Sequence, residues 1–207
     1  MRTFALIPIL ACSLSAGLVI DRIAVVVNRH ALKTSDIDRD VRLTAFLNNE
    51  QPKFDAESKK KAVERLIDQE IIRNQITTGG YRAATESDAA ALLTQIRRQR
   101  TGDSDARLRQ ELSRYGLSEE QLKAQLLWQL TVLRFIDERF RASVLVTDED
   151  VQNYYNQHRA NYRNPLEKES AGIRTTLEGE QVNEQFETWL AQARQRAQIE
   201  YREEALR

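Results

Sequence analysis

Residues 118–142 read SEEQLKAQLLWQLTVLRFIDERFRA, and they predict one long helix on which the rest of the chain packs. Ser118 and Gln121 have the spacing of a capping box, in which two side chains satisfy backbone N–H groups at a helix start. At about 100° per residue, the apolar side chains form two neighbouring stripes and leave a narrow polar face. The first stripe holds Leu122, Leu126, Leu130, Leu133, Ile136 and Phe140, and the second holds Trp128, Val132 and Phe135.

A helix that is apolar around most of its circumference has to be covered on two sides. The chain itself can supply one cover, and another protein can supply the other. The composition agrees with a mainly helical fold, because 207 residues contain only 7 Gly and 3 Pro. The 31 Lys and Arg residues balance 31 Asp and Glu residues. We therefore expect no nucleic-acid partner, since phosphate binding requires a basic face.

Residues 1–17 are typical of a cleaved secretory signal peptide, with basic Arg2, an apolar run from Thr3 to Leu14 and then small residues. The run is shorter than the roughly 20 residues of a membrane span. The sequence thus predicts a periplasmic mature protein without a transmembrane domain. Cys12 follows Ile-Leu-Ala, which leaves lipid anchoring through Cys12 as an alternative.

Short strands are predicted at both ends of the mature chain. The β-branched run over residues 19–27 indicates a strand, residues 28–30 a turn and residues 31–33 a return strand. Residues 198–202 alternate between apolar and polar side chains and indicate a final strand. We expect the two ends to pair in one sheet, which would bring together Ile23, Val25, Ile199 and Tyr201.

Helices are expected between these strands. The predicted ranges are 35–49, opened by Ser35 with Asp38; 56–77, stopped by Gly79-Gly80; 86–100, opened by Thr85 with Asp88; 105–115, ended by Gly116; 148–162, opened by Thr147 with Asp150; and 180–195. Residues 163–179 contain Pro165 and show no clear apolar stripe, so a linker or exposed loop is predicted there.

Five segments in this order carry a resemblance to a known family. They are DRIAVVVNRHALKTSDID (21–38), AVERLIDQEIIRNQ (62–75), YGLSEEQLKAQLLWQL (115–130), VTDEDVQNYYNQHR (146–159) and FETWLAQARQRAQIEY (186–201). Together they resemble the chaperone module of SurA-type periplasmic proteins and of the wider trigger-factor, PrsA and PpiD group. The resemblance implies a mainly α, multi-helix chaperone module over residues 18–162. It also implies that the helix and strand of residues 180–207 pack back on that module.

The sequence departs from the family in one respect. SurA-type proteins usually carry one or two parvulin prolyl-isomerase domains before the terminal helix, where this chain has only residues 163–179. A folded domain needs at least about 50 residues, so the isomerase domain is predicted to be absent. The motifs G-x-S-x-G, H-E-x-x-H, G-x-G-x-x-G and G-x-x-x-x-G-K-[ST] do not occur. We therefore expect no catalytic residue, no metal site and no cofactor.

These observations predict an ATP-independent chaperone, a holdase, for unfolded secreted or outer-membrane proteins. The predicted client-binding residues are Phe46, Trp128, Val132 and Phe135. Burial of the second stripe against the first and last helices is the alternative reading of the same residues. Two other functional classes stay open: a peptidyl-prolyl isomerase family member with residual activity, and an adaptor that assembles by swapping a terminal segment. A homodimer is compatible with each of them.

Overall fold

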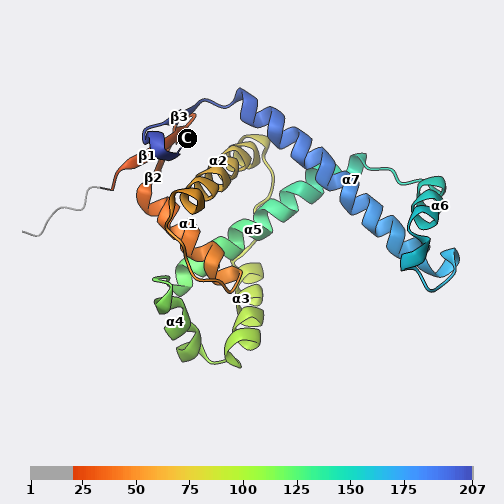
Figure 1. Ribbon diagram of the computed structural model, residues 1–207, viewed down its shortest axis with the longest axis horizontal. Helices are drawn as coiled ribbons and strands as arrows, with labels where there is room; N and C mark the ends of the chain where they lie inside the picture. Colours follow the sequence, from red (N-terminus) through yellow and green to blue (C-terminus); the bar gives the residue numbers. More distant parts are fainter. Residues whose placement is uncertain (1–20, 207) are drawn as a thin grey trace, which may run out of the picture.

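The computed structural model describes residues 21–206, so the predicted signal peptide and Cys12 lie outside the described residues. A compact body of strands and helices carries an arm that projects to one side (Figure 1). The prediction of a mainly α protein with a small sheet is confirmed. The elements are β1 (Ile23–Val27), β2 (His30–Lys33), α1 (Thr34–Leu47), α2 (Ala56–Gly79), α3 (Glu86–Thr101), α4 (Asp105–Arg114), α5 (Glu119–Phe140), α6 (Asp148–Gln157), α7 (Leu166–Arg196) and β3 (Ile199–Tyr201).

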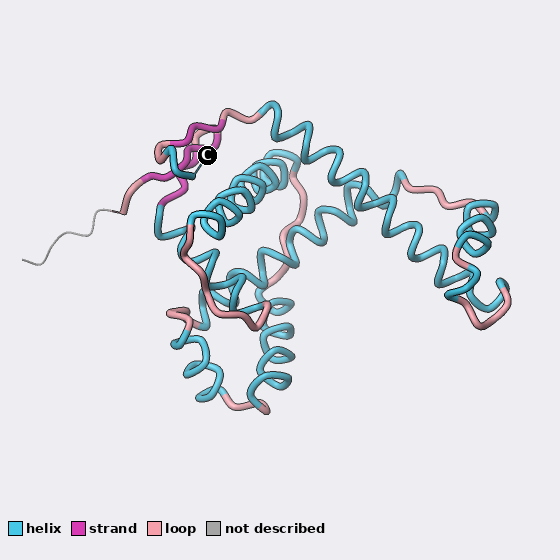
Figure 2. Tube along the Cα trace, in the orientation of Figure 1, coloured by secondary structure: helices cyan, strands magenta, loops and turns pink. Residues whose placement is uncertain are grey.

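The two ends of the described chain meet in an antiparallel sheet with the strand order β2-β1-β3 (Figure 2). Val25 lies opposite Tyr201 and Val27 opposite Ile199, which confirms the predicted pairing. The β1–β2 turn uses Asn28 at φ 55°, a left-handed conformation that asparagine tolerates. The backbone N–H of Asn28 also donates a 2.7 Å hydrogen bond to the carbonyl of Gln198. Residues 170 positions apart are thereby fixed in one sheet.

The start of α1 differs from the sequence prediction. Ser35 does not cap this helix, because its hydroxyl donates to the Asp21 carboxylate at 2.5 Å. The helix instead begins at Thr34, and the side chain of Asp36 accepts a 2.9 Å hydrogen bond from the backbone N–H of Lys33. The carboxylate that closes the first turn is therefore two residues earlier than predicted.

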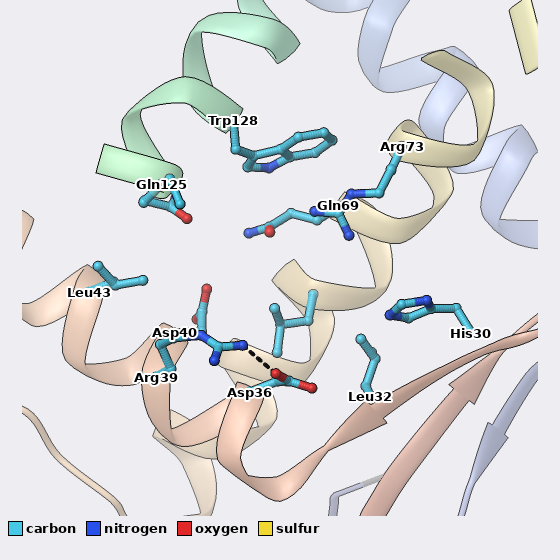
Figure 3. Close-up of a pocket in the computed structure, with 12 residues that line it drawn as sticks. His30, Leu32, Asp36, Arg39, Asp40, Leu43, Gln69, Arg73, Gln125 and Trp128 are labelled. Atoms are coloured by element: carbon cyan, nitrogen blue, oxygen red, sulfur yellow. Dashed lines mark hydrogen bonds and ion pairs between the residues drawn. The ribbon is translucent and has the colours of Figure 1, made fainter. Parts of the chain in front are cut away.

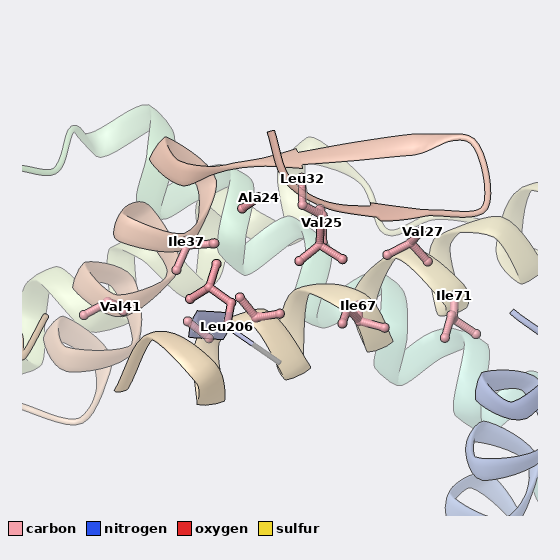
Figure 4. Packing of buried hydrophobic residues seen from close by; sticks show 11 residues of the cluster. Ala24, Val25, Val27, Leu32, Ile37, Val41, Ile67, Ile71 and Leu206 are labelled. Atoms are coloured by element: carbon pink, nitrogen blue, oxygen red, sulfur yellow. The ribbon is translucent and has the colours of Figure 1, made fainter. Parts of the chain in front are cut away.

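The inner face of the sheet covers α1 and α2 and forms the first core cluster (Figure 4). Side chains of β1 point down onto the apolar face of α2, and Leu206 from the last turn of the chain packs into the same cluster. The buried members of this cluster are Ala24, Val25, Val27, Leu32, Ile37, Val41, Ala62, Val63, Ile67, Ile71 and Leu206. Burying Leu206 here ties the last described residues to β1 and α2.

Charged side chains reinforce the return of the chain onto α2. Arg194, near the end of α7, donates to Asp68 at 2.6 Å and also hydrogen-bonds Glu64. The hydroxyl of Tyr201 in β3 donates to Glu64 at 3.1 Å. Burial, opposed by the nearby Arg194 guanidinium, holds the pKa of Asp68 above its ordinary value.

The prediction of a loop over residues 163–179 is wrong from Leu166 onward, because α7 is a single helix of 31 residues. Pro165 precedes its first turn, where a missing N–H costs nothing, and Glu167 and Glu169 lie where the helix dipole favours acids. The side chain of Ile173 is 1% exposed because α6 covers it. Tertiary packing therefore forms a helix in a segment that has no clear apolar stripe of its own.

We call residues 146–157, which include α6, together with residues 166–179 of α7 the arm. Its small core contains Val146, Val151, Tyr155 and Ile173. The arm lies at the far end of α7 from the sheet (Figure 1). Arg174 of α7 donates to Asp148 at 2.5 Å and so links α7 to the first turn of α6. None of the helices within residues 21–206 is both long enough and apolar enough to span a bilayer.

Replacing both arm glycines by alanine should stabilise the protein. Gly172 and Gly179 have no atom within 4 Å of the position that a Cβ would occupy. Alanine in an exposed helix interior is favoured over glycine by about 0.5–1 kcal/mol per site. We expect urea unfolding of Gly172→Ala/Gly179→Ala to show a free energy of unfolding higher by about 1–2 kcal/mol. A lower free energy of unfolding would contradict the helical assignment of this segment.

Candidate functional site

The two halves of α5 are covered on different faces. In the N-terminal half, Leu122 and Leu126 pack with Phe46 of α1 and with leucines of α3 and α4. In the C-terminal half, Phe135 and Phe140 pack with side chains of α2 and α7. Because the covered face changes along the helix, neither stripe seen in the sequence is buried over its full length.

The uncovered part of α5 forms a groove of about 990 Å³ beside the connection between α2 and α3. Its large apolar lining residues are Leu130, Leu133 and Ile136 of α5. Leu133 is 62% exposed, whereas Leu130 and Ile136 are partly buried. We call this surface the α5 groove. It offers aliphatic side chains to solvent at the centre of the molecule and not at a frayed end.

Charged side chains surround the α5 groove, and those of Arg134, Asp137 and Arg141 are held by defined contacts. Arg134 donates to the Asp88 carboxylate at 2.7 Å and to the carbonyl of Ala83 at 3.2 Å, so it joins α5 to the opposite wall. Hydrogen bonds from Thr85, together with the Arg134 guanidinium, hold the pKa of Asp88 below its ordinary value. Arg141 pairs with Asp137 one turn away. The groove is therefore apolar at its floor and polar at its rim, and it can bind apolar side chains of an extended segment.

Two of the four predicted client-binding residues are buried, so the prediction is wrong for Phe46 and Phe135. Both side chains are 0% exposed. The ring of Phe46 lies 4.4 Å from the guanidinium carbon of Arg100. Phe135 meets Tyr81 edge to face, with ring centroids 4.9 Å apart. These aromatic contacts hold the helices together and leave no surface for a client.

The other two predicted residues, Trp128 and Val132, are partly buried beside the α2–α5–α7 cluster. The Arg73 guanidinium carbon lies 4.6 Å from the centroid of a Trp128 ring. Trp128 also lines a smaller, polar pocket between α5, α2, α1 and β2 (Figure 3). The second stripe therefore mainly faces inward.

Sequence reasoning missed the exposed set, which belongs to the first stripe. Leu130, Leu133 and Ile136 share their face with charged neighbours that include Arg134 and Asp137. Charges beside apolar residues on one helical face indicate a solvent-facing apolar strip, because charged heads avoid a closed core. These charged neighbours were visible in the sequence, but the periodicity of the apolar residues alone does not distinguish the two stripes.

Asp40 is a buried carboxylate at the edge of the polar pocket. Its residue is 7% exposed, and Nε of Arg65 donates to Oδ2 at 3.0 Å. Burial raises the pKa of Asp40 above its ordinary value of 3.8, although the Arg65 hydrogen bonds and charge oppose the shift. No group of three or more His, Cys, Asp or Glu side chains within residues 21–206 is arranged to hold a metal ion.

Comparison with known proteins supports a chaperone-related family. No family model matches the sequence. The chain is 22% identical over 155 residues to a protein named Foldase protein PrsA in two strains of Clostridium kluyveri. The similarity covers 66% of this chain and 46% of each relative, so the chain spans about half the length of the curated relatives it matches. This distant similarity relates the chain to foldase-type chaperones in general.

Truncating Phe135 should strongly destabilise the protein. Phe-to-Ala substitutions in a packed core commonly cost about 3–5 kcal/mol, because they lose apolar burial and leave a cavity. We expect Phe135→Ala to lower the free energy of unfolding by about that amount in urea. Leu145→Ala is the control, because Leu145 is 79% exposed and should change stability by less than about 0.5 kcal/mol. Similar stability of both variants would refute the burial of Phe135.

The pH dependence of unfolding should differ between the wild type and Asp40→Asn. A carboxyl whose pKa is raised by folding binds its proton more tightly in the folded state. Its contribution to stability is therefore greatest below its ordinary pKa and is lost as pH rises through the raised pKa. We expect the free energy of unfolding of the wild type minus that of the variant to fall as pH increases from about 3.8 and then to level off. Chemical denaturation across this range measures it, and a difference that rises with pH would contradict the assigned direction.

Proposed function

We propose that this protein is a periplasmic, ATP-independent chaperone of the SurA type that holds unfolded secreted or outer-membrane proteins. The observation that carries the proposal is Leu133, an aliphatic side chain 62% exposed within the α5 groove. The similarity to foldase proteins supports the same reading. The charge pattern and apolar run of residues 1–17 support export.

Binding in the α5 groove would work by burial of apolar surface. Fully burying one large aliphatic or aromatic side chain contributes about 1.5–3 kcal/mol, which alone gives weak and readily reversible binding. A holdase needs no more than this at each site, because it lowers the concentration of free unfolded chains by mass action. The groove floor has no aromatic anchor, so any aliphatic or aromatic client side chain of suitable size fits it.

The ordered rim supports release as well as binding. Arg134 and Asp137 already have partners on the protein, Asp88 and Arg141 respectively. A bound client therefore does not have to neutralise Arg134 or Asp137. Because it forms no ion pair with them, it has none to break when it dissociates. Apolar contact at the floor dominates the affinity, and its loss on client folding favours dissociation.

We propose that the protein acts without prolyl isomerase chemistry. Between the end of α6 at Gln157 and the start of α7 at Leu166 lies only a short connection with one 3-10 turn at Arg159–Asn161. SurA-type relatives are expected to carry their isomerase domains in this interval. The continuous helix after Leu166 uses the remaining residues of the predicted linker for packing against α6.

The variant Leu133→Ser should weaken chaperone activity while leaving the fold intact. Removing one aliphatic contact of about 1.5 kcal/mol corresponds to roughly a tenfold loss of affinity. We expect about tenfold more variant than wild type to be needed for equal suppression of aggregation. The measurement is light scattering of an unfolded outer-membrane protein diluted from urea.

Leu145→Ser is the matched control for this experiment, because Leu145 is exposed but does not line the α5 groove. It should suppress aggregation as the wild type does. Thermal unfolding of both variants verifies that neither has lost the fold. Wild-type activity of a folded Leu133→Ser protein would remove the α5 groove as the client site.

A further inference from the structure

The polar pocket under Trp128 is separate from the α5 groove and has a different chemistry. It measures about 260 Å³, slightly below the roughly 300–1,000 Å³ of common small-molecule sites. Its walls come from β2, α1, α2 and α5, four elements that the body holds together (Figure 3). A pocket of this size between fixed elements accommodates a short piece of a larger ligand.

The charged side chains around this pocket are already paired. Asp36 pairs with Arg39 and Asp40 with Arg65. Arg73 pairs with Glu70 at 3.2 Å and lies against Trp128. Three acids are thus matched by three arginines at this site. The ligand that fits such a balanced environment is neutral, because a charged ligand would have to compete with an existing pair.

Hydrogen-bonding capacity remains within the pocket. Gln69 from α2 and Gln125 from α5 extend toward each other beneath Trp128. Among the 12 lining residues drawn, the dashed interaction joins Asp36 and Arg39, and none joins either glutamine amide to another lining residue (Figure 3). Both hydrogen bonds from Arg65 to Asp40 use Oδ2, so Oδ1 accepts none from the arginine.

A side-chain amide offers the same groups as a peptide bond, an N–H donor and a C=O acceptor. Two such amides, with a carboxylate oxygen beside them, match one peptide unit, whose N–H needs an acceptor and whose C=O needs a donor. The indole of Trp128 supplies an apolar surface for whatever side chain flanks that unit. A folded client offers far fewer such units than an unfolded one, because its buried backbone groups are already paired.

We propose that this pocket binds one backbone peptide unit of an extended client segment, through Gln69, Gln125 and Asp40, independently of the client side chains. The assignment rests on the proposed function, because it presumes unfolded polypeptide as the ligand. It adds a way to distinguish unfolded from folded chains that the α5 groove lacks. The α5 groove binds apolar side chains, and the pocket binds backbone N–H and C=O groups that are not hydrogen-bonded within the client.

The test uses the mature full chain and a capped neutral heptapeptide of Ser, Thr and Ala, which has no large apolar side chain for the α5 groove. Nitrogen-15-labelled protein reports binding through the indole N–H signals of its two tryptophans. We expect the Trp128 signal to shift saturably and the Trp189 signal to stay in place. A Trp189→Phe sample serves only to assign the two signals.

Two changes should weaken this binding to a similar extent. Methylating every backbone nitrogen of the peptide removes the N–H donor from whichever unit enters the pocket, and Gln69→Ala removes one hydrogen bond from the protein side; each change should raise the Kd about fivefold. Gln129→Ala is the matched control, because Gln129 is exposed on the same helix as Gln125 and does not line the pocket. It should leave the Kd unchanged.

Three results would overturn the proposal: no shift of the Trp128 signal at millimolar peptide, an unchanged Kd for the N-methylated peptide, or an unchanged Kd for Gln69→Ala. The N-methylated peptide tests the wild-type protein, so the result does not depend on a variant folding. Tighter binding of a cationic peptide than of the neutral one would also refute the proposal. It would mean that the arginines do not neutralise Asp36 and Asp40 in the pocket. The two proposals can fail separately. If Leu133→Ser keeps full aggregation suppression but the peptide still binds at Trp128, the α5 groove is rejected as the client site and the pocket proposal is supported.

Discussion

The apolar circumference of α5 is the constraint on which the rest of the structure depends. Its N-terminal half needs the α1–α3–α4 cluster and its C-terminal half needs α2 and α7. The α2–α7 contact in turn needs the chain to return from the arm and pair β3 with β1. After these contacts are made, Leu133 still projects into solvent. The α5 groove is therefore the part of α5 that no other described element covers. The helices packed on the remaining faces of α5 hold it in this exposed position.

Local sequence signals predicted much of the architecture. The capping boxes at Thr85, Ser118 and Thr147 form as expected, with the third helical residue answering each cap. Gly116 adopts the predicted left-handed conformation, at φ 66°. The alternation of Ile199 and Tyr201 was enough to place the last strand in the sheet. These features depend on a few adjacent residues, so the sequence alone contains the information.

The errors occurred where distant contacts decide the outcome. The first half of α7 has weak helical preference, and its order comes from α6 covering Ile173. The choice between the two stripes of α5 depends on where α2 and α7 cross that helix, which periodicity does not reveal. Phe135 and Leu133 are two residues apart, yet one is 0% and the other 62% exposed. A helical pattern identifies apolar faces, but it cannot tell which face a neighbouring helix will occupy.

The continuity of α7 has a mechanical consequence. A helix of 31 residues is about 46 Å long at 1.5 Å per residue, and it runs from the arm to the clamp formed by Arg194 with Asp68 and Glu64. Neither of its glycines is at positive φ, and its only proline neighbour lies before the first turn. The arm is thus joined to the body by one uninterrupted helix, so the length of that helix sets its distance from the sheet. A force on the arm is therefore transmitted along α7 to the ion pairs of Arg194 with α2.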